Sequence, residues 1–216
     1  MSGIDREYIP ALGVRALTPF YDFIQRWVVR DVRYKSRLIE QAGIHARQHV
    51  MDLGCGTGTL AIMVKQSQPQ ADVVGLDADP EMLTVARAKS IREGMEIKFD
   101  EGMTFDLPYA DASFDRVLSS IMIHHLKTPD KEKTAREIHR VLKPGGQLHV
   151  IDFGMPSSVY GKLLGPLLHR FEEANDNIDG RLPVIFAQAG LNVEEKGNFW
   201  TFFGDLTFLS AEKPQG

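Results

Sequence analysis

Short apolar runs alternate with longer segments of helical spacing between residues 48 and 155. A short apolar run bounded by turn residues is typical of a buried strand, while apolar residues repeated every three or four positions are typical of a helix. The expected strands are HVMDL, ADVVGLD, EIKFDEG, SFDRVLSSI and QLHVIDFG. The expected helices are TLAIMVKQSQ, DPEMLTVARAKSIREG and DKEKTAREIHRVLKPGG. This alternation predicts an α/β fold, with a mainly parallel sheet covered by helices on both faces.

Local chemistry predicts where two of these helices begin or end. Asp79 can cap the second helix, Pro80 suits its first position, and Gly94 can end it. We expect the third helix to end at Pro144 and Gly145, because proline cannot continue a helix.

The two ends of the chain depart from this alternation. Residues 1–47 have helical spacing, and residues 155–180 indicate one or two inserted helices before a last helix at about 178–189. The segments LNVEEKGNFW and GDLTFLSAEK predict two strands around a turn near Gly204. A terminal hairpin is usually antiparallel, so we expect a mixed sheet within a single domain of residues 1–216.

Composition narrows the possible functions. With 216 residues, of which 43% are hydrophobic, the chain suits one globular domain. Its net charge of -4 and its pI of about 6.0 argue against a broad nucleic-acid surface. The single cysteine, Cys55, excludes an intrachain disulfide and fits a reducing compartment. We find neither a signal sequence nor a run of roughly 18 apolar residues, so we expect a cytoplasmic protein without a membrane span.

The stretch VMDLGCGTGTL, residues 50–60, suggests a binding site. Glycines after a buried strand let a ligand approach the backbone, and the following helix directs its free N–H groups at that ligand. Asp77 ends the second strand, where a carboxylate can accept hydrogen bonds from a ribose diol. The pattern therefore predicts a ligand of the adenosine type.

Two ligand classes fit this pattern. The stretch GTGTLA matches the G-x-G-x-x-A fingerprint of dinucleotides such as NAD, which would indicate an NAD(P)-dependent oxidoreductase. Asp52 favours the other class, S-adenosylmethionine (SAM). A carboxylate that enters the loop suits the ammonium group of SAM and would repel the phosphates of a dinucleotide.

Four stretches in order closely resemble the class I SAM-dependent methyltransferases. They are VMDLGCGTG, VVGLDADPEML, LPYADASFDRVLSSIMIHHL and REIHRVLKPGGQLHVIDFG. The chain looks most like the branch of the ubiquinone/menaquinone-biosynthesis C-methyltransferases, and the resemblance covers residues 45–155. It implies SAM as the cofactor and a Rossmann-like fold. In that fold a seven-stranded mixed sheet has the order 3-2-1-4-5-7-6, with the seventh strand antiparallel.

The resemblance also implies cofactor contacts, residue by residue. It assigns Asp52, Gly54, Cys55, Gly56 and Gly58 to the methionine part of SAM, Asp77 to the ribose, Ala78 and Met82 to the adenine, and Ser119, Ser120 and Ile121 to the sulfonium. One position departs from the family pattern. Relatives often carry an aspartate that binds the adenine amine, where this chain has Met103 after Gly102. Backbone groups there can still bind adenine and the methionine can pack on the ring, or Asp100, Glu101 or Asp106 can supply the acceptor.

Three further side chains could be reactive. We expect Cys55 to be a small filler beside the cofactor rather than a reactive thiol. His124 and His125 are adjacent and should point apart, so we expect no shared metal ion and no metal cofactor. His124 corresponds to a position that often faces the active site in the family, which makes it a candidate for substrate contact or for a general base. The alternative for His124 is packing or polar lining, and His125 is expected to be structural.

An aromatic cluster near the start of the chain either packs on the core or shields the reacting methyl group. Its members are Tyr8, Phe20, Tyr21, Phe23 and Trp27. Tyr21 is a second catalytic candidate. We expect the helical cap of residues 1–47 and the insertion of residues 155–180 to form a substrate lid.

The sequence as a whole predicts a SAM-dependent methyltransferase that acts on a small or lipid-like molecule by in-line displacement. Quinone precursors, other aromatics and lipid or amine head groups are possible acceptors. The fourth strand is not followed by an NPPY-type tetrad, which argues against methylation of adenine or glutamine amides, and one cysteine argues against an arsenic methyltransferase. We expect no nucleic-acid partner, and peripheral membrane contact stays open. Two alternatives to the methyltransferase stay open, an NAD(P)-dependent oxidoreductase and a non-catalytic SAM-binding or interaction module.

Overall fold

A computed structural model describes residues 31–155, 175–201 and 204–215. The strands are β1 (His49–Leu53), β2 (Asp72–Asp77), β3 (Lys98–Glu101), β4 (Phe114–Ser120), β5 (Leu142–Phe153), β6 (Asn192–Thr201) and β7 (Gly204–Glu212). The helices are α2 (Asp31–Ala42), α3 (Thr59–Ser67), α4 (Pro80–Arg92), α5 (Thr128–Val141), α7 (Asn175–Ile178) and α8 (Leu182–Gln188), with a short 3-10 turn, η2 (Ile123–His125). The aromatic cluster that includes Tyr21 and most of the predicted insertion lie outside the described residues.

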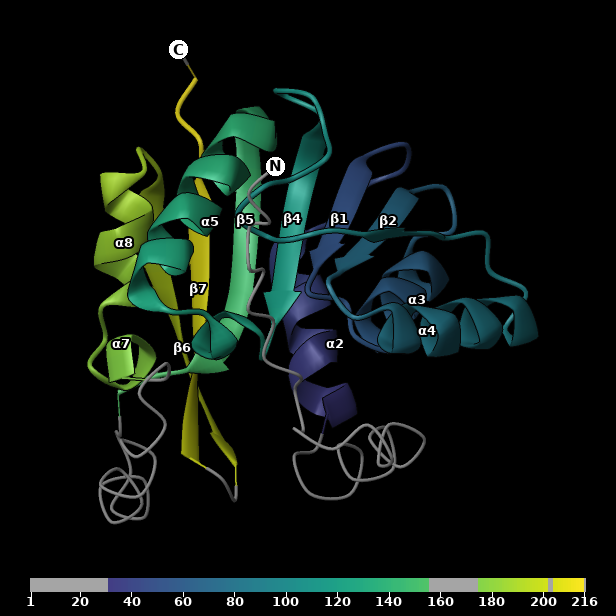
Figure 1. Cartoon of the computed structure of the whole chain (residues 1–216), viewed down its shortest axis with the longest axis horizontal. Helices are drawn as coiled ribbons and strands as arrows, with labels where there is room; N and C mark the ends of the chain where they lie inside the picture. Colours follow the sequence, from purple (N-terminus) through teal and green to yellow (C-terminus); the bar gives the residue numbers. More distant parts are fainter. Residues whose placement is uncertain (1–30, 156–174, 202–203, 216) are drawn as a thin grey trace, which may run out of the picture.

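The strands form one sheet of order β3-β2-β1-β4-β5-β7-β6 (Figure 1). β1 pairs in parallel with β2 and β4, and β4 pairs in parallel with β5. β7 runs antiparallel to both β5 and β6, with which it forms the predicted hairpin. The predicted α/β class, the strand order and the antiparallel seventh strand are confirmed.

Two hydrophobic cores cover the two faces of the sheet. Along β1, Val50 points into a core with residues of α2, α3 and α4, whereas Met51 points into the opposite core with residues of α5 and α8. Figure 1 shows α5 and α8 together in front of the sheet. Successive side chains of a strand point to opposite faces. A strand buried on both faces therefore reads as a continuous apolar run rather than an alternating one.

The start of α4 agrees with its prediction. The Asp79 carboxylate caps the helix by accepting hydrogen bonds from the backbone N–H groups of Glu81 at 2.8 Å and Met82 at 3.4 Å. Pro80 is the first helical residue, and Gly94 follows the helix with a φ of +66°.

Two other predicted helix boundaries are wrong. α5 ends at Val141, before the predicted stop at Pro144 and Gly145, because Leu142 is extended and pairs with Phe114 of β4. The predicted last helix at about 178–189 begins later, as α8 at Leu182, because Gly180 takes a φ of +70° between α7 and α8. Among the described helices, none is long and apolar enough to cross a membrane.

Candidate functional site

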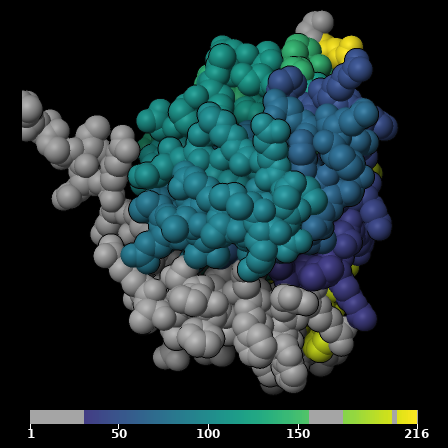
Figure 2. Space-filling view, turned by 90° about the vertical axis from the view of Figure 1, so that its right-hand side faces the viewer, coloured from purple at the N-terminus to yellow at the C-terminus, as the bar shows by residue number. Residues whose placement is uncertain are grey.

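The predicted binding residues that the structure describes lie at one edge of the sheet. β1, β2, β4 and β5 are parallel, so their carboxyl ends meet there (Figure 1). The loop after β1 is fixed to the end of β2, because the backbone N–H groups of Gly54 and Cys55 donate to the Leu76 carbonyl at 2.8 and 2.9 Å. In Figure 2 the segments that carry α3, α4 and β3 form the blue and teal surface on one side of the molecule.

Glycine is required at the three loop positions for different structural reasons. All three take a positive φ, which disfavours other residues. A Cβ on Gly54 would lie 2.2 Å from Met122 Cγ, and a Cβ on Gly58 would lie 2.9 Å from both Ala86 and Phe99. Among the residues that the structure describes, none has an atom within 4 Å of a Cβ placed on Gly56. Two glycines therefore serve the packing of the protein itself, and only Gly56 borders open space.

Asp52 is a residue of β1, and its buried carboxylate lies at the start of α3. Its Oδ2 accepts a hydrogen bond from the Ala61 backbone N–H at 2.9 Å, and its side chain is almost entirely removed from solvent. Burial raises the pKa of Asp52 to about 7, although the positive charge of Lys35 acts in the opposite direction. A cationic group placed beside Asp52 would favour its charged form. The position therefore suits a cation more than a phosphate.

Asp77 joins the end of β2 to the glycine loop. Its carboxylate accepts hydrogen bonds from the Gly56 N–H at 2.7 Å and from the Asp79 N–H at 2.9 Å. Burial raises the pKa of Asp77. Each carboxylate oxygen can accept about two hydrogen bonds, so Asp77 keeps acceptor capacity for the hydroxyl groups of a ligand.

Cys55 is buried between the glycine loop and β2. A Cβ on Gly75 would lie 2.9 Å from its sulfur, so the thiol fills the space that this glycine leaves. Burial, reinforced by the charges of Asp52 and Asp77, holds the pKa of Cys55 well above its usual range. A thiol that stays protonated is a poor nucleophile, which agrees with the filler predicted from the sequence.

The residues predicted to contact adenine gather beside β2 and β3. Met82 is buried on α4, Ala78 is half-buried before it, and the Gly102 N–H donates to the Asp77 carbonyl at 3.0 Å. Met103 forms an isolated antiparallel bridge with Asp106. Asp100, one of the alternative acceptors, already accepts a hydrogen bond from the Tyr109 hydroxyl at 3.1 Å.

The end of β4 carries an unpartnered hydroxyl and a strained residue. Ser119 Oγ donates to the Leu53 carbonyl at 3.1 Å, which ties β4 to β1. Ser120 Oγ is buried and has no hydrogen-bond partner within residues 31–155, 175–201 and 204–215. Ile121 takes a φ of +51°, which is rare for a β-branched residue and costs of order 1–3 kcal/mol. Strained backbone and orphaned polar atoms in native proteins cluster at functional sites.

Asp152 is a site residue that the sequence analysis missed. Its Oδ2 accepts hydrogen bonds from the backbone N–H groups of Met122, Ile123 and His124 at 3.1, 2.7 and 3.3 Å. Its Oδ1 lies 2.8 Å from His124 Nδ1. Although burial opposes the charged form, the His124 ring and the backbone donors hold the pKa of Asp152 below its usual range. The available signal was an acid one residue before the end of a strand, since Asp152 precedes Phe153 in QLHVIDFG as Asp52 precedes Leu53 in HVMDL.

The carboxylate of Asp152 orients the His124 ring. With Nδ1 donating to Asp152, the neutral ring carries its lone pair on Nε2, the arrangement that a general base needs. The His125 ring lies beside it at a centroid distance of 4.0 Å and an angle of 40°, so the expectation that the two side chains point apart is wrong, because both belong to the tight 3-10 turn η2. Burial lowers the pKa of His125 to about 3. His125 is therefore neutral near pH 7. Within the ranges that the structure describes, no three His, Cys, Asp or Glu side chains gather as a metal site would require.

Comparisons with known proteins identify the family. A family model described as a methyltransferase domain matches residues 50–146. The chain is 39% identical over 142 residues to a demethylmenaquinone methyltransferase from Thermus thermophilus, covering 65% of this chain and 64% of the relative. It is 33% identical over 201 residues to a demethylmenaquinone methyltransferase from Listeria monocytogenes, covering 82% and 84%.

The extent of these matches differs among the relatives. The chain spans less than two thirds of the Thermus relative and 59% of one from Deinococcus radiodurans. Among solved structures, phosphoethanolamine N-methyltransferase 2 from Haemonchus contortus, bound to phosphomonomethylethanolamine and S-adenosylhomocysteine, has the same fold, with a TM-score of 0.77 at 17% identity. That likeness covers 95% of this chain and 58% of the other. By its sequence matches, the chain belongs to the class I methyltransferases, in the branch that includes the demethylmenaquinone and ubiquinone/menaquinone C-methyltransferases.

Proposed function

We propose that this protein is an enzyme that transfers a methyl group from SAM to a small-molecule acceptor. The observation that carries the proposal is the pair of carboxylates that hold the turn from β1 to α3: Asp77 accepts from the Gly56 N–H, and the buried Asp52 accepts from the Ala61 N–H. Membership of the methyltransferase family supports the same reaction. The acceptors that we propose are a quinone precursor, another aromatic molecule, or a lipid or amine head group.

The described residues fit the chemical groups of SAM. The buried carboxylate of Asp52 suits the ammonium group, and Asp77 has acceptor capacity for the two ribose hydroxyls. Gly56 leaves room for a ligand at the backbone, and Ser120 Oγ lacks a partner that a bound ligand can supply. We propose that Met82, Ala78, Gly102 and Met103 surround the adenine, with backbone groups replacing the missing aspartate.

When bound, SAM supplies a methyl group attached to a sulfonium, which an acceptor atom takes by in-line displacement. The protein's part is to align the acceptor with the methyl group, because correct orientation can lower the activation barrier by several kcal/mol. For an acceptor that must lose a proton, we propose His124 Nε2 as the base, with Asp152 stabilising the resulting imidazolium. Tyr21 and the lid of residues 1–47 and 155–180 remain proposals, and Tyr21 and residues 156–174 lie outside the described ranges.

Two alternatives make different predictions. An NAD(P)-dependent oxidoreductase would bind a dinucleotide, and its phosphates would lie near Asp52. A non-catalytic SAM-binding module would bind SAM without turnover. We also propose that the protein acts in the cytoplasm without a metal cofactor or a nucleic-acid partner, and that contact with a membrane, if the acceptor is a lipid, is peripheral.

Calorimetric titration of the full chain tests the cofactor. We expect S-adenosylhomocysteine (SAH) to bind in the micromolar range and NAD(H) not to bind. Asp77→Ala should abolish SAH binding, whereas Asp72→Ala, which removes an exposed carboxylate of the same strand, should leave it unchanged. Binding of NAD(H) without SAH would overturn the proposal. A screen of the proposed acceptors with methyl-labelled SAM then separates an enzyme from a binding module.

A further inference from the structure

α2 lies on the face of the sheet opposite α5 and α8 (Figure 1). Its last turn covers His149 of β5, a residue that is 2% exposed and takes no part in the site proposed above. A buried imidazole needs a hydrogen-bond partner at each ring nitrogen, because an unpaired polar group in the interior costs free energy. The protonation state of His149 therefore depends on its neighbours.

The tautomer of His149 is fixed by Gln41 of α2. The side-chain nitrogen of Gln41 donates to the Leu209 carbonyl at 3.0 Å and lies 3.1 Å from His149 Nδ1. An amide nitrogen can only donate, so Nδ1 must accept and the ring proton must be on Nε2. Nε2 is buried, and among the described residues none accepts a hydrogen bond from it. One ring nitrogen is thus paired with α2, and the other carries an unpaired N–H group.

The charged groups nearest to His149 oppose a positive charge on its ring. Burial lowers the pKa of His149 to about 3, and Arg116 of β4 and Lys196 of β6 act in the same direction. On α2, Arg37 is half-buried and adds a third cation to this face, while Glu40 is exposed. The ring is therefore neutral near pH 7 and is flanked by cations.

The two acids on the neighbouring strands are paired with other side chains. Glu194 Oε2 of β6 lies 2.5 Å from Lys196 Nζ, and Glu212 of β7 accepts a hydrogen bond from Gln147 Nε2 at 2.9 Å. β7 places an uncharged residue, Ser210, beside the histidine. Both carboxylates are therefore engaged, and neither pairs with the imidazole.

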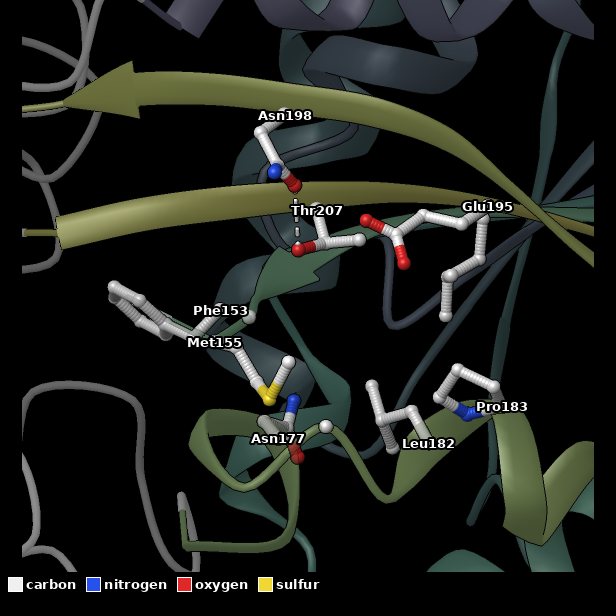
Figure 3. Close-up of a pocket in the computed structure, with 11 residues that line it drawn as sticks. Phe153, Met155, Asn177, Leu182, Pro183, Glu195, Asn198 and Thr207 are labelled. Atoms are coloured by element: carbon white, nitrogen blue, oxygen red, sulfur yellow. Dashed lines mark hydrogen bonds between the residues drawn. The ribbon is translucent and has the colours of Figure 1, made fainter. Parts of the chain in front are cut away.

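A second anchor of α2 does not respond to acid. The Arg37 guanidinium donates to the Asn198 and Lys196 carbonyls of β6 at 3.2 and 2.9 Å, and lies 4.3 Å from the centre of the Phe208 ring. Figure 3 shows the Asn198 and Thr207 side chains facing each other across the β6–β7 hairpin, where a hydrogen bond of 2.9 Å joins them. Because an arginine stays charged at every pH at which proteins fold, this anchor holds α2 equally in acid and at neutral pH.

Protonation of the histidine would break the contact between α2 and β5. A second ring proton, on Nδ1, would point at the Gln41 amide nitrogen, so that two donors face each other. Turning the amide over would place its oxygen against the Leu209 carbonyl, which is also an acceptor. The new charge would be buried beside cations, where it is strongly disfavoured. Movement of α2 away from the sheet removes these conflicts, because water can then reach the ring.

We propose that His149 makes the docking of α2 sensitive to acid, so that protonation of its ring releases the helix from β5. The open form is rare near neutral pH, because α2 also buries Tyr34 and Leu38. The helix carries Lys35, whose positive charge opposes the effect of burial on the Asp52 carboxylate. Release of α2 therefore removes a cation from the candidate site. The inference rests on the packing of α2 and not on the identity of the ligand.

The two states of the ring define how strongly acid should open α2. In the released state His149 has an ordinary pKa of about 6.5, whereas in the docked state burial lowers its pKa. The docked state is therefore fully stable above about pH 6.5 and loses stability as the pH falls below that value. Relative to pH 7.5, we expect the equilibrium constant for opening of α2 to be about tenfold larger at pH 5.5 and about a hundredfold larger at pH 4.5.

Hydrogen exchange of the full chain without ligand, followed by mass spectrometry, measures this opening. Exchange rates are corrected for the intrinsic pH dependence of amide exchange, and α5, on the other face of the sheet, is the internal reference. We expect α2 to lose protection between pH 7.5 and 5.5 while α5 keeps it. Equal losses in both helices would show that acid unfolds the whole chain, and constant protection of α2 would show that the ring does not titrate. Either result would overturn the inference.

His149→Asn removes the titrating group and keeps an oxygen that can accept the hydrogen bond from Gln41. We expect opening of α2 in this variant to be independent of pH between 7.5 and 5.5. His45→Asn is the matched control, because His45 is exposed and lies three residues after the end of α2. It should keep the wild-type pH dependence. The same dependence in His149→Asn would assign the titration to another group and would contradict the proposal.

Gln41→Glu tests the contact from the side of the helix, in case His149→Asn does not fold. A carboxylate that faces Nδ1 would form an ion pair with the protonated ring in place of two opposed donors. We expect opening of α2 to stop rising in acid, and 15N NMR of the histidine rings at pH 6.5 to show a charged His149 where the wild type shows the neutral Nε2–H form. A neutral ring with the wild-type response to acid would refute the role of this contact.

Discussion

At the scale of single residues, the candidate site contains three carboxylates in different electrostatic states. Burial raises the pKa of Asp52 and Asp77, because each accepts few hydrogen bonds. Asp152 accepts four backbone N–H groups and faces a histidine ring, so its pKa is lowered although it is as buried as Asp52. The first two are therefore suited to respond to a ligand, and the third is suited to hold the structure around it.

The protonation of Asp52 makes cofactor binding depend on pH. With a pKa of about 7 in the free protein, Asp52 is largely protonated at pH 6.0 and must release that proton to face an ammonium group. We expect SAH to bind roughly an order of magnitude more weakly at pH 6.0 than at pH 7.5, as measured by calorimetry. Asp52→Asn should flatten this profile, while Asp72→Asn should keep it. A flat profile in the wild type would contradict the role of Asp52.

Asp152 should make a large contribution to stability. Replacing it with Asn removes the charge that holds the loop after β4, and we expect a loss of about 2–3 kcal/mol of unfolding free energy at pH 7. Because its folded pKa is lowered, the contribution is complete above the unfolded value of about 3.9 and is lost as the pH falls through the folded pKa.

Urea unfolding at pH 7, 4 and 3 measures this contribution. The difference between wild type and Asp152→Asn should narrow below pH 4, whereas Asp72→Asn should change stability little at any of these pH values. An equal difference at all three pH values would show that the charge of Asp152 does not stabilise the fold.

At the scale of elements, the turn from β1 to α3 combines packing with binding. Gly54 and Gly58 allow the loop to lie against Met122 and against Ala86 and Phe99, whereas Gly56 borders open space. The same GCGTG motif therefore contains glycines that the fold requires and a glycine that we assign to the ligand. The sequence alone does not distinguish them, because all three positions require glycine for the same local reason, a positive φ.

Alanine substitutions should separate the two kinds of glycine. Gly54→Ala should cost roughly 2–5 kcal/mol of stability, since left-handed strain adds to a clash with Met122. Gly56→Ala should cost only about 1–2 kcal/mol but should weaken SAH binding at least tenfold. Gly94→Ala is the matched control, because Gly94 has a similar φ and open space at the end of α4. It should lower stability as Gly56→Ala does, with SAH binding unchanged, and equal stability losses at Gly54 and Gly56 would contradict this division.

At the scale of the whole molecule, a ligand held by several elements should stabilise the complete fold. At a free concentration of 100 times its Kd, SAH should add about 2.7 kcal/mol to the free energy of unfolding. For a chain of 216 residues, this corresponds to a rise in Tm of about 5–10 °C by scanning calorimetry. NAD at the same concentration should leave Tm unchanged, and an equal rise with NAD would favour the dinucleotide alternative.

The sequence by itself determined the succession of elements and the edge of the sheet where the site lies. Apolar runs that end in Asp52 and Asp77 identified buried strands with acids at their carboxyl ends, and the glycine motif identified the turn between β1 and α3. These features are local, because a strand, a cap or a tight turn is specified by residues close together in the chain. Their spacing is also what identified the family.

The tertiary structure decided what depends on residues far apart in the chain. The end of α5 at Val141 is set by pairing of Leu142 with Phe114, and the role of Asp152 arises from its contact with a loop about 30 residues earlier. Long-range pairing and burial are properties of the packed chain, so local patterns cannot predict them.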